Sequence, residues 1–122
     1  HSYKLFFFFL GEALKSSESP KDGMLADFRD LKDMVGRAVI GKFDHALVLM
    51  EGTPLSQELS AAYTNVIILP FRPTSENLIS HFASLIKGEM ESDPKFVHTR
   101  LFSIKLHETA TSFVEWFAED NQ

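Results

Sequence analysis

Asp44 and His45 place a carboxylate directly beside an imidazole in this 122-residue sequence. A carboxylate that contacts a histidine can fix the tautomer of the ring and raise its basicity, which suits proton transfer. Neighbouring residues pair through their side chains only where the backbone turns between them. The dipeptide therefore indicates either a proton relay at a turn or an ordinary surface turn after a helix.

Glu108 is a second residue that could do chemistry, because it extends an apolar row of a predicted strand. In that strand Phe102, Ile104 and Leu106 lie on one face. Glu108 continues the same face. A carboxylate in such a row is costly to bury unless it meets a pair of hydrogen-bond donors. Glu108 therefore either binds a donor pair or marks the point where the strand emerges into solvent.

Residues 73–78 have the composition of a helix start. Thr74 or Ser75 can cap the first turn. Glu76 suits the positive end of the helix dipole, and Leu78 begins a buried stripe. These residues have a structural role whether or not they also bind a ligand.

The elements that would position these groups follow from apolar periodicity and turn residues. Strands are predicted at residues 3–12, 24–28, 65–69, 97–109 and 112–117, with extended or turning chain at 44–50. Helices are predicted at residues 30–41, 54–63 and 75–90. The first would begin with Asp30 as its N-cap and end at Gly41. This order predicts an α+β fold, an antiparallel sheet with two helices packed on one face.

The first predicted strand carries four consecutive phenylalanines at residues 6–9. Such a run places apolar side chains on both faces of a sheet. The helices of the chain can cover one face only. The other face therefore predicts contact with a neighbouring subunit.

Composition is that of an ordinary globular protein, with 44% apolar and 24% charged residues, and we expect one domain over residues 1–122. The net charge of −5 and the lack of a basic stripe argue against a nucleic-acid partner. The longest apolar run, residues 5–10, is far shorter than the roughly 20 residues of a membrane-spanning helix. It also lacks the features of a signal peptide. The sequence contains no cysteine, so disulfide usage does not indicate the redox compartment. A cytoplasmic location is expected by default.

Four short strings, in this order, resemble the 6-pyruvoyltetrahydropterin synthase family, whose bacterial members include 6-carboxytetrahydropterin synthase. They lie at residues 23–32, 43–45, 73–78 and 107–109, and the first contains Asp-Phe-Arg-Asp-Leu-Lys. The resemblance implies the tunnelling fold, in which subunits join their sheets into a barrel, and a homo-oligomer of the trimer or hexamer type. It also implies that the family's N-terminal strand and Cys/His motif are missing before His1.

The resemblance implies a role for each candidate residue. Asp44 and His45 would form a proton relay with a cysteine from the missing segment. Glu108 would anchor a pterin, whose N3–H and 2-amino group lie side by side and suit a carboxylate acceptor. The turn with Thr74 would line the pterin pocket, and Glu76 would help to hold the ring.

His1 resembles the last histidine of the family's zinc motif, because Ser2 and Tyr3 follow it as they do there. The resemblance implies a catalytic Zn2+ held by three histidines, with His1 as one of them. Taken alone, a histidine at this position needs no metal role. The family usually has Asn where this chain has Arg72, a departure that could alter the charge of the pocket.

The implied activity is that of a zinc-dependent carbon–oxygen lyase acting on 7,8-dihydroneopterin triphosphate. Its product would be 6-carboxytetrahydropterin, for queuosine, or 6-pyruvoyltetrahydropterin, for tetrahydrobiopterin. Two alternatives stay open: a member that cleaves the dihydroneopterin side chain as an aldolase does, and a pterin-binding module without catalysis. The residue at the cysteine position would separate the two enzymes, and zinc content would separate either enzyme from the module.

Overall fold

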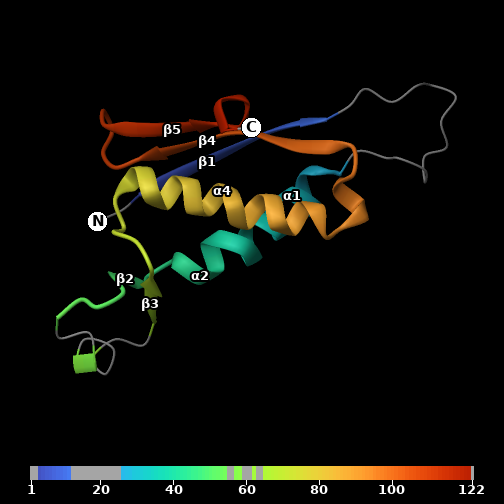
Figure 1. The fold of residues 1–122 in the computed structure, drawn as a ribbon. Helices are drawn as coiled ribbons and strands as arrows, with labels where there is room; N and C mark the ends of the chain where they lie inside the picture. Colours follow the sequence, from blue (N-terminus) through green and yellow to red (C-terminus); the bar gives the residue numbers. More distant parts are fainter. Residues whose placement is uncertain (1–2, 12–25, 55–56, 59–61, 63–64, 122) are drawn as a thin grey trace, which may run out of the picture.

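A three-stranded antiparallel sheet forms one layer of the fold, and helices form the other (Figure 1). The computed structural model describes residues 3–11, 26–54, 57–58, 62 and 65–121. The sheet has the order β1 (Lys4–Gly11), β4 (Thr99–His107) and β5 (Phe113–Phe117), so β4 is central. The long helix α4 (Ser75–Glu91) and the run that begins with α1 (Phe28–Val35) lie on one side of it. The predicted α+β architecture is confirmed.

A second, smaller sheet was not predicted. It consists of β2 (Leu47–Met50) and β3 (Val66–Leu69), which pair in parallel and lie apart from the main sheet (Figure 1). The strand predicted at residues 65–69 is thus confirmed, but its partner is the chain that follows the first helical run. Of the helix predicted at residues 54–63, the structure describes Gln57, Glu58 and Ala62 as helical, and residues 55–56, 59–61 and 63 lie outside the described part.

The first helix begins earlier than the sequence analysis placed it. Asp27, not Asp30, is the N-cap, and its side chain accepts a hydrogen bond from the Asp30 backbone N–H at 2.8 Å. The Asp30 side chain accepts in return from the Asp27 N–H at 3.2 Å, which completes a capping box. Phe28 is therefore helical, so the prediction of a strand at residues 24–28 is wrong at this residue. Residues 24–25 lie outside the described part.

Gly41 was predicted to end the first helix, and this prediction is wrong. A π-helical segment, η1 (Gly36–Ile40), follows α1 and leads into the short helix α2 (Gly41–Phe43). The Gly41 N–H donates to the Gly36 carbonyl, five residues back, and a Cβ at Gly41 would lie only 2.8 Å from that oxygen. Glycine is therefore needed here for a close backbone approach and not for a left-handed turn.

The core lies between α4, the α1–η1 run and the inner face of the main sheet. Its fully buried large side chains are Met34, Val39, Ile86, Ile104 and Leu106. Each contributes about 1.5–3 kcal/mol through removal of apolar surface from water. The buried stripe predicted to begin at Leu78 is confirmed: Leu78, Phe82 and Ile86 are buried, and Leu85 beside them is half-buried.

The phenylalanine-rich strand β1 is apolar on both faces. Leu5, Phe7 and Phe9 pack against the core, and Phe6, Phe8 and Leu10 point outward and are roughly half-exposed. The alternation follows from the two-residue period of a strand. Within the described chain the outer row remains uncovered, as the sequence analysis anticipated.

The apolar row of β4 is interrupted by a β-bulge. The partner of Phe8 in β4 is Ser103 and that of Phe9 is Leu101, so Phe102 has no partner in the ladder. Leu101 is buried instead of Phe102. The inner row continues beyond the bulge through Ile104 and Leu106 to Glu108. Two short 3-10 helices, η2 (Pro94–Phe96) and η3 (Ala118–Asn121), complete the described elements.

No helix in the described part of the chain is long and apolar enough to cross a membrane.

Candidate functional site

Asp44 and His45 occupy the centre of a tight turn between α2 and β2. The Ala46 N–H donates to the Phe43 carbonyl at 3.1 Å. Asp44 has φ −64° and ψ 127°, and His45 has φ +56°. These angles match a type II turn, whose third residue is usually glycine or asparagine because its φ is positive. A histidine in this conformation carries strain of the kind that collects at functional sites.

The side chains of this pair lie close together at the surface. Nε2 of His45 is 3.7 Å from Oδ1 of Asp44, which is longer than a hydrogen bond. The His45 side chain is 93% exposed and that of Asp44 is 64% exposed. The backbone turn thus brings the two groups within reach of each other and leaves the imidazole open to a ligand.

Asn65 stabilises this turn, and the sequence analysis did not single it out. Its side-chain amide donates to the carbonyls of Lys42, at 3.2 Å, and Asp44, at 3.4 Å. Its backbone carbonyl accepts from the Leu47 N–H at 2.9 Å. Asn65 directly precedes β3, so these bonds connect the start of β3 to the end of α2, more than twenty residues earlier in the chain.

Glu108 meets hydroxyl donors on both of its oxygens. The Ser75 hydroxyl donates to Oε1, and the Ser112 hydroxyl lies 3.4 Å from Oε2. The Glu108 N–H also donates to the Ser112 carbonyl at 2.9 Å. The half-buried carboxylate therefore joins the start of α4 to the turn between β4 and β5, and its Oε2 is only weakly engaged.

The start of α4 is built as predicted. Thr74 is the N-cap, and its hydroxyl accepts from the Asn77 N–H at 3.2 Å. The Asn77 side chain donates to the Arg72 carbonyl at 2.9 Å, which fixes the preceding turn. Glu76 lies in the first turn and is exposed. The positive end of the helix dipole also favours the nearby Glu108 carboxylate.

A cavity of about 360 Å3 adjoins the Asp44–His45 turn. Asp44 and His45 line it, and Tyr3, Leu78 and Leu106 are among its other lining residues. Its size is in the range of small-molecule sites.

Three of these lining residues are near other candidate site residues in the sequence. Tyr3 is two residues after His1, Leu78 is two after Glu76, and Leu106 is two before Glu108. Glu108 itself is not among the described residues that line the cavity.

His1, the predicted metal ligand, is not among the residues that the structure describes. Within the described ranges, no three His, Cys, Asp or Glu side chains converge as metal ligands would. The described residues alone do not make a zinc site.

Two further histidines are packed against aromatic rings. The His107 ring lies 5.6 Å from the Phe6 ring and 5.2 Å from the Phe113 ring, on the outer face of the sheet. His81, on α4, contacts Phe43 and Phe71. Burial, and secondarily the charge of Lys42, lower the pKa of His81 below its usual value of 6.5.

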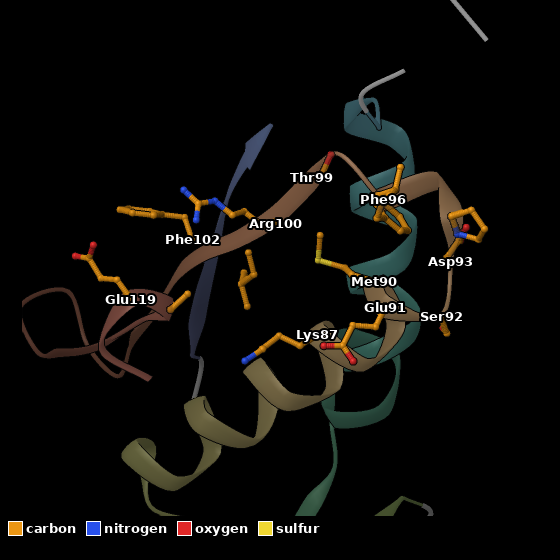
Figure 2. A pocket seen from close by; sticks show the side chains of 14 residues that line it. Lys87, Met90, Glu91, Ser92, Asp93, Phe96, Thr99, Arg100, Phe102 and Glu119 are labelled. Carbon is orange, nitrogen blue, oxygen red and sulfur yellow. The ribbon is translucent and has the colours of Figure 1, made fainter. Parts of the chain in front are cut away.

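A larger cavity, of about 570 Å3, lies at the opposite end of α4 (Figure 2). Its walls come from the last turn of α4, the first half of β4 and the start of η3. Charges of both signs surround it, among them Lys87, Arg100 and Glu119. None of the residues that the sequence analysis singled out as site residues lines it, so size alone does not identify the site.

Comparison with known proteins shows the family to which this chain belongs. Residues 1–119 match the 6-pyruvoyl tetrahydropterin synthase family, and the chain belongs to that family. A solved structure of an uncharacterized protein from Wolinella succinogenes has the same fold, with a TM-score of 0.60 and 17% identity. The alignment covers 95% of this chain and 96% of that one.

The curated relatives carry one name, 6-carboxy-5,6,7,8-tetrahydropterin synthase. That of Haemophilus influenzae is 29% identical over 120 residues, which cover 95% of this chain and 79% of the relative. That of Rickettsia bellii is 35% identical over 95 residues, covering 76% and 67%. That of Rickettsia conorii is 29% identical over 105 residues, covering 84% and 74%.

Proposed function

We propose that this chain is a lyase of the 6-carboxytetrahydropterin synthase type that acts on 7,8-dihydroneopterin triphosphate. The observation that carries the proposal is the 360 Å3 cavity, which Asp44 and His45 line together with Leu78 and Leu106. Leu78 is two positions from Glu76 in the sequence, and Leu106 is two positions from Glu108. The names of the curated relatives support the choice of reaction. Formation of 6-pyruvoyltetrahydropterin is the neighbouring reaction of the same family.

Glu108 is the pterin anchor in this proposal. Its Oε1 is held by Ser75, and its weakly engaged Oε2 is free to turn toward a ligand. The N3–H and 2-amino group of a pterin can replace the weak contact with Ser112 by two charge-assisted hydrogen bonds. The Thr74 turn and Glu76 complete the pocket around the ring.

The Asp44–His45 pair moves protons on the substrate side chain. His45 is the general base or acid, since its imidazole is exposed and imidazole is the side chain most often used for proton transfer. Asp44, 3.7 Å away, orients the ring. Zn2+ is the proposed cofactor, with His1 as one ligand, and when bound it polarises a substrate oxygen.

The protein acts as a homo-oligomer, of the trimer or hexamer type. The outer row of β1, with Phe6, Phe8 and Leu10 roughly half-exposed, offers an apolar surface for another subunit. Within the described part of the chain, β1 and β5 are both edge strands of the main sheet. Pairing of such edges between subunits would extend the sheet.

The test is to incubate the purified protein with 7,8-dihydroneopterin triphosphate and to measure the product by mass. A mass for 6-carboxytetrahydropterin or 6-pyruvoyltetrahydropterin, with about one zinc per subunit by elemental analysis, supports the proposal. A pterin product that keeps a 6-hydroxymethyl group would show the aldolase-like reaction instead. Pterin binding without turnover in zinc-loaded protein would show a binding module.

A further inference from the structure

His81 lies at the centre of an aromatic cluster, defined here as Phe43, Phe71, His81 and Phe82. The centre of its ring is 6.0 Å from that of Phe43, at an interplanar angle of 74°, and 5.4 Å from that of Phe71, at 61°. Phe43 also contacts Phe82 edge-on at 4.9 Å. Edge-to-face pairs in this range fix the rings relative to one another.

The two phenylalanines that touch His81 adjoin the two loops of the proposed site, the Asp44–His45 turn and the segment 72–75. Phe43 directly precedes Asp44 and His45, and its carbonyl closes their turn. Phe71 directly precedes the segment 72–75 that leads into α4. Each loop is thus attached to the same ring on α4, less than two helical turns beyond the Thr74 cap.

We infer that His81 is a positioning residue, whose neutral ring holds the Asp44–His45 turn in register with the start of α4, and whose protonation releases that register. The inference rests on the proposed function for its catalytic consequence. The structural claim, that protonation of His81 changes the relative position of the two loops, does not depend on which ligand the site binds.

The surroundings of His81 favour the neutral ring. A second small cavity, of about 320 Å3, is lined by His81, Lys42 and Asn65 together with apolar residues. Lys42 is the one charged residue among the described residues that line it. On α4 itself, Asn77 and Leu85, one turn away on either side, are uncharged.

Protonation sets two effects against each other. An imidazolium gains some attraction from nearby aromatic rings. It also loses hydration on burial and meets the positive charge of Lys42, and these two effects lower the pKa of His81. On this inference the charged ring moves toward water and away from Phe43 and Phe71, the two rings that it contacts in the neutral form.

The structural part is tested by nuclear magnetic resonance on the full chain. The His81 ring proton is followed from pH 8 down to about pH 5, a range around the ordinary value for histidine, together with the backbone amides of Arg72, Thr74 and Ser75. The background is His45→Gln, which removes the other histidine of the site. We expect the three amides to shift with the same midpoint as His81, and to stop shifting in His81→Phe. Amide chemical shifts that do not change with pH, or that change with a midpoint different from that of the His81 ring proton, would overturn the inference.

Lys42→Met supplies a second readout that a purely structural role would not move. Removing the positive charge raises the pKa of His81, so the midpoint of the ring and of the amides should move together to higher pH. Asn65 bonds the Lys42 backbone carbonyl, so that contact survives the substitution. A midpoint that stays in place, or amides that separate from the ring, would contradict the inference.

The catalytic part is tested by the pH dependence of kcat in the zinc-loaded oligomer. His81→Phe should keep kcat near that of the unmodified protein at neutral pH and lose part of its acid decline. His81→Ala should lower kcat by roughly tenfold to a hundredfold, as small displacements of catalytic groups do. Equal losses and unchanged pH profiles in both variants would overturn the inference. If the unmodified protein has no turnover, the proposed function fails, and the amide titration still decides the structural part.

Discussion

The hydroxyl of Ser75 donates a hydrogen bond to Oε1 of Glu108. One contact thus ties the first residue of α4 to the residue that follows β4, although the two are 33 positions apart in the chain. In the proposed site this contact aims the carboxylate that binds the pterin.

Ser75→Ala removes that donor and leaves Oε1 of Glu108 without it. The free energy of unfolding should fall by about 1 kcal/mol, because the carboxylate is half-buried and partly rescued by water. Pterin affinity should fall as well, since the carboxylate is no longer aimed. Urea denaturation and calorimetric titration measure the two effects. Ser80→Ala, an exposed position on the same helix, is the matched control and should change neither.

His45→Gly separates the strain of the turn from its chemistry. Glycine adopts φ +56° without the penalty of about 1 kcal/mol that a Cβ carries there, although it also gives the unfolded chain more freedom. His45→Gly should therefore be more stable than His45→Ala by up to about 1 kcal/mol, and both should lose turnover. Chemical denaturation gives the comparison. A less stable glycine variant would contradict the type II turn.

Gly41 and Gly36 form a matched pair for the π-helical segment. In Gly41→Ala the new Cβ would lie 2.8 Å from the Gly36 carbonyl oxygen, so the backbone must shift at a cost of about 1–3 kcal/mol. In Gly36→Ala nothing lies within 4 Å of the new Cβ, and the helix should gain up to about 1 kcal/mol. Equal stability of the two variants would show that the π turn is not held by the glycine.

His81 should also make stability depend on pH. Because its pKa is lowered in the folded protein, the unfolded chain binds the proton more tightly. The contribution is complete above the ordinary value near 6.5 and is lost as the pH falls through the lowered value. The free energy of unfolding, from urea curves across this range, should decline less steeply in His81→Phe. A steeper decline in that variant would reverse the assigned direction.

Strong periodic patterns were sufficient to predict the long elements. The apolar stripe of α4 and the alternating rows of β1 and β4 each depend on local spacing, which the sequence displays directly. The start of α4 was predictable for the same reason, because Thr74 and Asn77 bond within one turn. The fold class and the family followed from these elements and from the ordered motifs.

Features that depend on distant backbone approach were not predictable. Gly41 looks like a helix end, and only the position of the Gly36 carbonyl shows that the helix continues through a π turn. The bulge at Phe102 follows from pairing with β1, which is remote in sequence. Ser75 was considered as a cap, and its bond to Glu108 required the tertiary structure. Asn65 has no local signal at all.

Binding of 7,8-dihydroneopterin to the Glu108→Gln variant tests the account most directly. Glutamine keeps the shape of the side chain and loses the charge and one of its acceptors. We predict that calorimetric titration finds affinity lower by roughly tenfold to a hundredfold, as expected for charge-assisted bonds of about 1.5–3 kcal/mol. Glu115→Gln, the same change at an exposed position of β5, should bind as the unmodified protein does. Unaltered affinity in Glu108→Gln would contradict the assignment of this carboxylate as the pterin anchor.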